Sequence, residues 1–170
     1  MKDSSNGLPS ADALIKLMYQ KIMGKIDSNT CLVGIPDGGH LLIKSLQGMI
    51  AEKIHYGLID GSFYRDDLDI SGLKVKDKST NINFDINNKK VILIDDVFYT
   101  GRTSRAAINE IFDYGRPKEI LLYVLIDRQS SELPIQPNFS AVKTRIPSDT
   151  YIDLKSEHGQ LKFKTRIIND

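Results

Sequence analysis

The sequence is poor in the residues that hold small extracellular domains together. Among its 170 residues there is a single cysteine, Cys31, and there is no tryptophan. A lone cysteine cannot form an intramolecular disulfide, so a disulfide-stabilised secreted fold is excluded. Cys31 lies inside the apolar run CLVGI, and we interpret it as a small core residue in preference to a nucleophile.

An excess of charge of either sign is also missing. Lys and Arg total 23 against 22 for Asp and Glu, which gives a formal net charge of +1. No global field therefore favours nucleic acid or an anionic membrane, although a basic patch on one face is compatible with this balance. The chain has no apolar run long enough to span a bilayer and no signal peptide, so we expect a cytoplasmic protein without membrane contact.

What is present is the composition of an ordinary globular protein, with 41% hydrophobic and 26% charged residues. The length predicts one domain over 1–170. Residues 1–9, MKDSSNGLP, are polar and contain a glycine and a proline, so we expect a frayed terminus there. No internal repeat or low-complexity segment is evident.

Helices and strands are predicted to alternate in the first half of the chain. Leu14, Met18 and Ile22 recur at helical spacing after Ser10 or Asp12, either of which can cap the helix. The run CLVGI predicts a short buried strand, and PDGGH predicts a tight turn. Further along we expect a helix at Leu41–Ile54, a strand at 57–65 and an exposed, mobile hairpin within 66–88.

The second half predicts a strand, a helix and a second strand. VILID and EILLYVLID are apolar without alternation, as in a sheet that is covered on both faces. Between them a helical pattern begins near Thr103 and stops at Gly115. This order predicts a parallel sheet with right-handed crossovers. The alternating C-terminal segment YIDLKSEHGQLKFKTRI predicts a hairpin that turns at His158-Gly159.

Two adjacent carboxylates end the first of these strands, in VILIDDVFYTGRTS. Like charges held close together resist ionisation, so a core strand gains nothing from Asp95 and Asp96. Ligands of parallel sheets bind beyond the carboxyl ends of the strands, and the turn YTGRTS leads into a helix whose first N–H groups can bind phosphate. The carboxylates suit hydroxyl donors and Mg²⁺. The pattern predicts a ligand with a phosphate and a diol, such as a ribose 5-phosphate.

A plainer interpretation is a solvated strand end followed by a helix cap. We favour the binding site because an apolar strand precedes the aspartates and a Thr-Gly-x-Thr turn follows them. The spacing is neither that of a Walker loop, GxxxxGK[ST], nor that of a dinucleotide fingerprint.

The stretch VILIDDVFYTGRTSRAA resembles the phosphoribosyl-diphosphate signature of the type I phosphoribosyltransferases. YRDDL at 64–68, GRPKEI and VLIDR…ELPI resemble one subfamily, the pyrimidine regulatory proteins that are also uracil phosphoribosyltransferases. The resemblance covers about residues 31–135. It implies an α/β fold with a central, mostly parallel sheet flanked by helices, a mobile hairpin loop and a small hood. It also implies a reaction in which uracil and phosphoribosyl diphosphate (PRPP) give UMP and diphosphate.

The resemblance further implies roles for single residues. Asp95 and Asp96 would hold the ribose hydroxyls, Arg65 would lie at the base of the mobile loop, and these three are the expected catalytic residues. Mg²⁺ would be held mainly by the substrate and by water, with no direct protein ligand. The residues expected to bind PRPP are Asp37, Gly38, Gly39, Asp95, Asp96, Val97, Tyr99, Thr100, Gly101, Arg102, Thr103 and Ser104, and those expected to bind uracil are Ile126, Asp127 and Arg128.

Simpler roles stay open for two of the arginines. Arg65 can be a surface residue paired with Asp66 or Asp67. Arg128 can form an ion pair with Asp127 at the end of the strand.

The loop after the first strand departs from the family pattern. Related enzymes commonly carry a threonine and an arginine before the glycine, where this sequence has Asp37 and Gly38. One cation is missing and one anion is added, so we expect weaker diphosphate binding unless the backbone amides of Gly38 and Gly39, or His40, offset the change. From the sequence, Asp37→Thr combined with Gly38→Arg is predicted to lower the KM for PRPP.

The subfamily also binds messenger RNA, and RNA binding needs a basic face. The segment ALIKLMYQKIMGKID carries only scattered lysines, and AVKTRIP lacks the usual Gly-Lys, so this activity rests on the resemblance alone. Two hypotheses remain: a uracil phosphoribosyltransferase, or a regulator that senses UMP and PRPP, binds leader RNA and has weak or no catalysis. Purine salvage is disfavoured because VLIDR…ELPI is of the pyrimidine type. For either hypothesis we expect a homo-oligomer.

Overall fold

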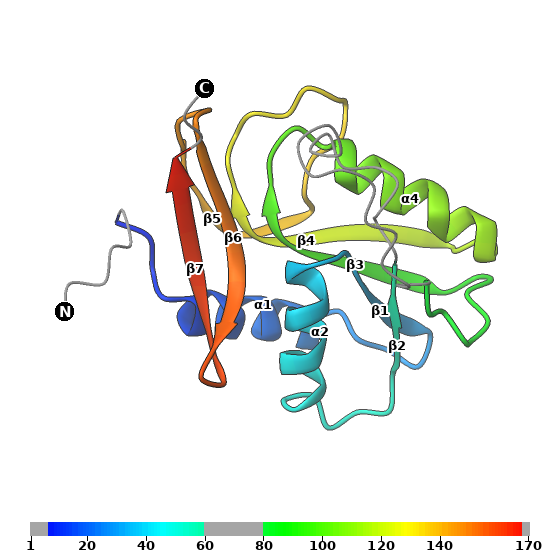
Figure 1. Cartoon of the computed structure of the whole chain (residues 1–170). Coiled ribbons are helices and arrows are strands. Elements are labelled where there is room, and N and C mark those ends of the chain that lie inside the picture. The colour runs from blue at the N-terminus through cyan, green and yellow to red at the C-terminus, as the bar shows by residue number, and fades with distance from the viewer. Residues whose placement is uncertain (1–6, 60–79, 168–170) are drawn as a thin grey trace.

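The computed structural model describes residues 7–59 and 80–167. These residues form a five-stranded parallel sheet, in the order β2-β1-β3-β4-β5, and a separate two-stranded hairpin, β6-β7 (Figure 1). The strands are β1 (Thr30–Gly34), β2 (His55–Leu58), β3 (Lys90–Phe98), β4 (Glu119–Asp127), β5 (Phe139–Lys143), β6 (Thr150–Glu157) and β7 (Gln160–Ile167). The helices are α1 (Ala11–Met23), α2 (Gly38–Gln47) and α4 (Arg102–Tyr114).

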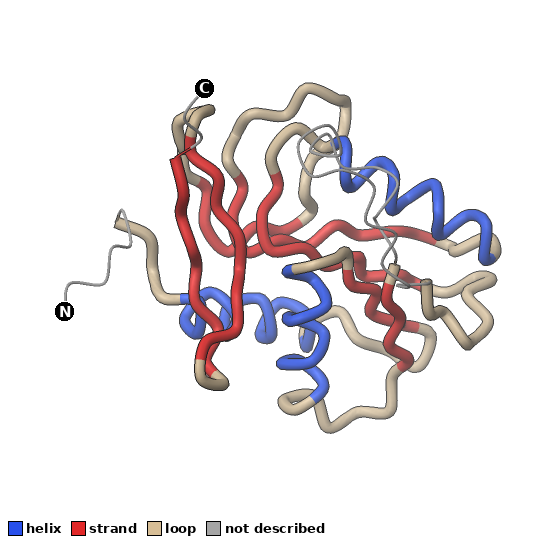
Figure 2. Tube along the Cα trace, viewed as in Figure 1, coloured by secondary structure: helices blue, strands red, loops and turns tan. Residues whose placement is uncertain are grey.

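Helices cover both faces of the sheet, α1 and α2 on one side and α4 on the other (Figure 2). Ile92 and Ile94 of β3 pack in the apolar cluster that contains α1 and α2. Their neighbours Val91 and Leu93 pack in the cluster that contains α4. A strand buried on both faces needs apolar residues at every position, which explains why VILID shows no alternation. The predicted parallel sheet is confirmed.

The start of α1 follows from its capping residue. Ser10 is the N-cap, and its Oγ accepts a hydrogen bond from the backbone N–H of Ala13 at 3.3 Å. Of the two candidate caps in the sequence, the structure uses this serine. Leu14, Met18 and Ile22 are buried on one face of the helix, as their spacing predicts. No helix within 7–59 and 80–167 combines the length and the apolar content that crossing a membrane would need.

The predicted bounds of the second helix are wrong at both ends. α2 begins at Gly38, inside the predicted turn PDGGH, and ends at Gln47, well before Ile54. An ideal Cβ on Gly39 would lie 2.2 Å from the carbonyl oxygen of Ile94, so only glycine lets the helix start directly on β3. After Gln47 a turn directs Ile50 into the core. The start of α2 is thereby held against β3 near its carboxyl end.

Two side chains of the described segment before β3, Ile82 and Ile86, are more buried than its polar composition predicts. β2 ends at Leu58, and residues 60–79, with most of the predicted strand and mobile hairpin, lie outside the described residues. Asn81 forms a bridge with Leu58, and Ile82 and Ile86 are buried in the cluster under α4. The prediction of an exposed segment is therefore wrong at Ile82 and Ile86, which complete the core, whereas the asparagines and the aspartate between and after them are exposed.

The C-terminal hairpin is confirmed, with the turn at the predicted place. His158 and Gly159 have φ angles of +50° and +80°, the left-handed values that tight hairpin turns require. Ile152 and Leu154 of β6 are buried in the cluster formed with α1 and α2, which fixes the hairpin over that side of the molecule. We call β6 and β7 the hood hairpin. The edge strand β5, which pairs with β4, was not predicted because four of its five residues are only half-buried, the fifth is exposed, and polar residues flank them.

Candidate active site

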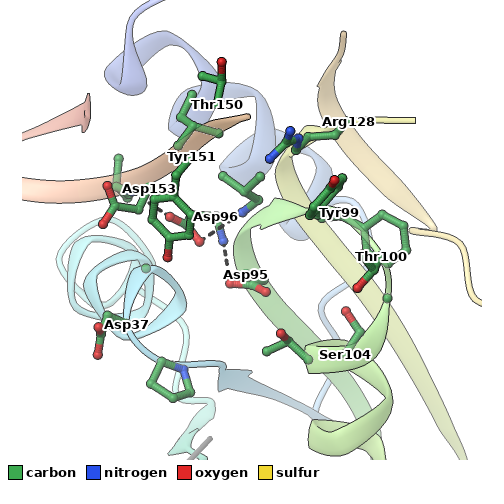
Figure 3. A pocket seen from close by; sticks show the side chains of 18 of the residues that line it. Asp37, Asp95, Asp96, Tyr99, Thr100, Ser104, Arg128, Thr150, Tyr151 and Asp153 are labelled. Atoms are coloured by element: carbon green, nitrogen blue, oxygen red, sulfur yellow. Dashed lines mark hydrogen bonds between the residues drawn. The ribbon is translucent and has the colours of Figure 1, made fainter. Parts of the chain in front are cut away.

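A cavity of about 270 Å³ opens beyond the carboxyl ends of β1, β3 and β4. One side, which we call the motif wall, is formed by residues 95–101, Thr103, Ser104 and Arg128. The other side, the hood wall, is formed by residues 36–38, Ser148 and residues 150–155. In Figure 3 the aspartate pair lies between the two groups of side chains, with Tyr99, Thr100, Ser104 and Arg128 on one side and Asp37, Tyr151 and Asp153 on the other.

The aspartate pair lies at the floor of this cavity, with Asp95 6% and Asp96 8% exposed. Backbone donors surround the carboxylates. Oδ2 of Asp96 accepts a hydrogen bond from the N–H of Leu154 in the hood hairpin at 2.6 Å, and its Oδ1 accepts one from Val97 at 3.0 Å. Oδ1 of Asp95 accepts from the N–H of Asp96 at 2.9 Å. The pair therefore joins the sheet to the hood.

Burial raises the pKa of Asp96 above its ordinary value, because removal from water disfavours the charged form. Hydrogen bonds from Asp95 and from the backbone of Leu154 and Val97 act in the opposite direction but do not cancel the effect of burial. A carboxylate in this position gains from additional hydrogen-bond donors. The hydroxyls of a sugar are donors of that kind.

The turn after β3 has the geometry of a phosphate cradle. Gly101 is the N-cap of α4 with a φ of +91°, a left-handed conformation in which other residues are strained. The N–H of Arg102 donates to Oγ1 of Thr100 at 3.3 Å, which tightens the turn. Thr103 and the buried Ser104 line the cavity in the first turn of α4. Helix N-termini present N–H groups and a positive dipole end, so this turn suits a phosphate.

Arg128 closes the motif wall, although its side chain is almost wholly buried. Its guanidinium lies over the ring of Tyr99, 3.9 Å from the centroid, and Nη2 donates to the carbonyl oxygens of Ile146 at 3.3 Å and Pro147 at 2.7 Å. Burial lowers the pKa of this arginine. Its Nε has no hydrogen-bond partner among the residues of the described ranges. A buried donor without a partner is costly, so the stacking on Tyr99 and the two carbonyl acceptors must hold Arg128 in this position.

The loop between β1 and α2 presses against the aspartate pair. An ideal Cβ on Gly38 would lie 2.1 Å from Cγ and 2.4 Å from each carboxylate oxygen of Asp96. Glycine is therefore required at this position as long as Asp96 keeps its place. His40 does not line the cavity, because its Nε2 lies 3.0 Å from the carbonyl oxygen of Ile59. It is not placed to offset the negative charge of Asp37.

Comparison with known proteins decides the family. Residues 5–159 match the family model described as the phosphoribosyl transferase domain. The chain belongs to the phosphoribosyltransferase family.

Curated relatives carry the name Bifunctional protein PyrR. The chain is 46% identical to the one from Caldicellulosiruptor bescii over 132 residues, which are 75% of this chain and 72% of the relative. It is 46% identical to the one from Nostoc punctiforme over 150 residues, 84% of this chain and 82% of the relative. The resemblance that the sequence motifs suggested is confirmed, and with it a pentosyltransferase of the PyrR type.

Solved structures confirm the fold. A hypoxanthine-guanine phosphoribosyltransferase from Bacillus anthracis superposes with a TM-score of 0.63 at 19% identity and covers 83% of each chain. A purine phosphoribosyltransferase from Pyrococcus horikoshii gives a TM-score of 0.58 at 21% identity, covering 78% of this chain and 81% of that one. At these identities the likeness concerns the fold alone.

The structure brings most of the predicted PRPP residues of this phosphoribosyltransferase to one cavity. Asp37, Gly38 and the segment from Asp95 to Ser104 all contribute, with the exception of Arg102. The guanidinium of Arg102 instead pairs with Glu132 on the surface, with Nη2 2.9 Å from Oε2. Gly39 is also outside the lining, because it packs against the carbonyl of Ile94. Arg65 lies outside the described residues.

The three residues expected to bind uracil lie in different surroundings. Arg128 lines the cavity, whereas Ile126 is fully buried in the core on the side of α1 and α2. Oδ1 of Asp127 accepts from the N–H of Gln129 at 2.8 Å, and its Oδ2 lies 3.9 Å from Nζ of Lys143. The alternative ion pair between Asp127 and Arg128 is thus replaced by one with Lys143. The two strand residues face the protein, and the base would meet Arg128.

Sequence reasoning missed the part of the hood wall that comes from the C-terminal segment. Seven of the lining residues come from the hood hairpin and the segment before it, namely Ser148, Thr150, Tyr151, Ile152, Asp153, Leu154 and Lys155. Alternation in the sequence predicts the hairpin but not where it docks. The one available signal was the buried position of the aspartate pair, which implies that some other segment must cover it.

Magnesium, which the family implies, fits the chemistry of this cavity. Among the described lining residues four are aspartates, and carboxylate oxygens suit a hard divalent cation or its bound waters. No group of three or more His, Cys, Asp or Glu residues within 7–59 and 80–167 converges as a metal site. The ion would be bound by oxygens of the substrate and by water, and the cavity aspartates would accept hydrogen bonds from those waters.

Proposed function

We propose that this phosphoribosyltransferase makes UMP and diphosphate from uracil and PRPP with Mg²⁺. The observation that carries the proposal is the motif wall, where the aspartate pair and the phosphate cradle line one cavity at the end of β3. A ribose 5-phosphate carries a diol, which suits the aspartate pair, and a phosphate, which suits the cradle. The name of the curated relatives and the pyrimidine-type VLIDR…ELPI motif support uracil as the base.

The proposed reaction replaces one bond at the anomeric carbon. The bond from that carbon to the diphosphate oxygen breaks, a bond to N1 of uracil forms, and the N1 proton is lost to solvent. Mg²⁺ would supply positive charge to the leaving diphosphate. Asp95 and Asp96 would orient the ribose through its hydroxyls, and Thr100, Thr103 and Ser104 would hold the 5-phosphate. Positioning and charge, not a nucleophilic side chain, would lower the barrier.

Base recognition is assigned to the end of the motif wall that carries Arg128. Arg128 lines the cavity with its guanidinium over Tyr99, and a guanidinium can donate to a carbonyl oxygen of uracil. The role proposed for Arg65, closure over the substrate, is carried by the resemblance alone. A homo-oligomeric state and a cytoplasmic location likewise stay predictions.

The test is diphosphate release that depends on both uracil and Mg²⁺, with UMP identified as the product by chromatography. Hypoxanthine in place of uracil is the control for base choice, and a reaction without base measures hydrolysis of PRPP. Turnover with uracil and not with hypoxanthine is expected. Turnover with hypoxanthine alone would replace the proposed substrate, and no turnover with either base would remove the proposed activity.

A second candidate is a regulator that senses UMP and PRPP, binds leader RNA and turns over slowly or not at all. Asp37 favours it, because an anion in the diphosphate loop weakens catalysis, and so does the name of the relatives. Filter binding of leader RNA against a scrambled control, at several salt concentrations, tests this candidate. On single strands log affinity falls with log salt by about 0.7 per neutralised phosphate, and with scattered lysines we expect a shallow slope and little preference for the leader. Tight, leader-specific binding enhanced by UMP would give the regulator first place.

A further inference from the structure

The charges around the cavity do not balance those of a PRPP molecule. Of the described residues that line it, four are aspartates and two, Arg128 and Lys155, are cationic. Arg128 is held by the carbonyl groups of Ile146 and Pro147, and it lies across the cavity from Asp37 (Figure 3). On the side of Asp37, where the diphosphate of PRPP would lie, the cationic side chain that lines the cavity among the described residues is Lys155 of the hood.

A second hollow of about 330 Å³ continues the cavity on this side. It shares Asp37 and part of β6 with the first and adds residues of β7. The register of the hairpin explains its composition, since Tyr151 is paired with Arg166 and Asp153 with Lys164 on the same face of the ribbon. The cationic residues that line it are Lys155, Lys164 and Arg166.

We propose that Lys155 of the hood hairpin binds the diphosphate of PRPP, with Lys164 and Arg166 adding positive charge behind it. The hood would thus replace the cation that the loop at Asp37 and Gly38 lacks. Lys155 is the residue of this basic group that lines both hollows. This proposal rests on the proposed function, because it assigns a binding residue to that reaction.

The present contacts of Lys155 are compatible with this role. Its Nζ lies 2.6 Å from Oδ2 of Asp153, in a pair whose side chains are 46% and 22% exposed. Such partly exposed pairs contribute little, and an ammonium group has three donors, so Lys155 can add a phosphate oxygen without losing Asp153. The hydrogen bond to Asp153, together with the charges of Asp153 and Asp37, raises the pKa of Lys155, so it stays protonated at neutral pH.

Binding measurements with three probes separate this proposal from the proposed function. The probes are PRPP and inorganic diphosphate, each with Mg²⁺, and UMP, which has no diphosphate. Lys155→Ala is expected to weaken PRPP and diphosphate binding roughly ten- to hundred-fold, the effect of losing a charge-assisted hydrogen bond, and to change UMP affinity less than about two-fold. Lys155→Arg keeps the charge and is expected to restore most of the affinity.

Lys162→Ala is the matched control. Lys162 is the cross-strand partner of Lys155 on the same ribbon, and it lines neither hollow. Its removal changes the net charge equally and should leave all three affinities within about two-fold. Circular dichroism of each variant verifies that the hairpin is intact.

The binding results distinguish three cases. Loss of PRPP and diphosphate binding in Lys155→Ala, with UMP binding and the Lys162→Ala protein unchanged, supports the hood as the diphosphate site. Unchanged diphosphate affinity, or an equal loss for UMP, overturns the role of Lys155 and leaves the proposed function standing. If the unmodified protein binds neither PRPP nor UMP, the proposed function fails and the assignment of Lys155 fails with it.

Discussion

The motif wall and the hood wall enclose one cavity but are built in different ways. The motif wall comes largely from one continuous stretch, residues 95–104, at the end of the central strand β3 and the start of α4. The hood wall combines residues of two segments more than a hundred residues apart, 36–38 and 148–155. The first therefore keeps its geometry through local structure, whereas the second depends on how the hood docks.

A hydrogen bond joins the two walls, from the N–H of Leu154 to Oδ2 of Asp96. The hood backbone thus uses an acceptor that a ribose hydroxyl would also use. A carboxylate oxygen has two lone pairs, so a ribose hydroxyl that donated to Oδ2 of Asp96 would share this oxygen with the N–H of Leu154.

The largest expected effect comes from neutralising the motif wall. Asp95→Asn combined with Asp96→Asn keeps the size of both side chains and removes the charge that strengthens their hydrogen bonds. Each charge-assisted bond is worth about 1.5–3 kcal/mol, so PRPP affinity should fall at least about a hundred-fold. Isothermal titration with PRPP and Mg²⁺ measures the change. Asp113→Asn, an exposed aspartate on α4, is the control, and unchanged affinity in the double variant would end the assignment of the diol site.

The second prediction, on the loop at Asp37 and Gly38, is opposite to the one made from the sequence. Asp37→Thr with Gly38→Arg was predicted to lower the KM for PRPP by restoring a cation. In the structure a side chain at Gly38 collides with the carboxylate of Asp96, which is held by backbone hydrogen bonds. Overpacking costs about 1–3 kcal/mol, and for a chain of this length each kcal/mol lowers Tm by about 2–4 °C. We expect a lower Tm and about ten-fold weaker PRPP binding.

The single variant Asp37→Thr separates the effect of the negative charge at Asp37 from the effect of the steric collision at Gly38. It removes the anion and leaves Gly38 in place, so KM for PRPP should fall a few-fold while Tm changes little. A double variant that keeps its Tm and binds PRPP more tightly than the single variant would show that the loop can move away from Asp96.

The difference between the two walls also explains what the sequence could predict. The strands β1, β3 and β4, the helices α1 and α4, and the hood hairpin follow from apolar spacing and from turn residues such as His158-Gly159. The motif wall follows from one contiguous motif. These features depend on neighbours along the chain, which a sequence displays directly.

The remaining features depend on contacts between distant segments. The start of α2 at Gly38 depends on the close approach of Gly39 to β3, and the burial of Ile82 and Ile86 depends on α4. The side chain of Arg102 turns to Glu132, 30 positions further along, instead of the cavity. The docking of the hood on Asp96 is of the same kind. Neither the structural propensity of a residue nor the spacing of apolar residues along the chain records contacts between distant segments.

A smaller effect concerns pH and the contact between the walls. The pKa of Asp96 is raised above 3.8 in the folded protein, so the folded state holds this proton more tightly than the unfolded chain does. The resulting stability is full below pH 3.8 and is lost as pH rises through the folded pKa. Asp96→Asn does not titrate. The Tm of this variant minus that of the unmodified protein should therefore increase from about pH 4 to pH 8 in thermal unfolding followed by circular dichroism. A difference that stays flat or decreases with pH would contradict the burial of this carboxyl.

The smallest effect is expected at Arg102, which the sequence assigns to PRPP and the structure assigns to the surface. Its side chain and that of Glu132 are each 52% exposed, and exposed pairs contribute at most about 1 kcal/mol. The N–H of Arg102 bonds Thr100, a contact that alanine retains. Arg102→Ala should therefore change PRPP affinity less than about three-fold and lower Tm by no more than about 4 °C. Glu132→Ala, which breaks the same pair from the other side, is the control. If Arg102→Ala weakens PRPP binding ten-fold or more while Glu132→Ala does not, the guanidinium leaves Glu132 to bind the ligand, and the motif wall includes a side chain that the unliganded cavity does not show.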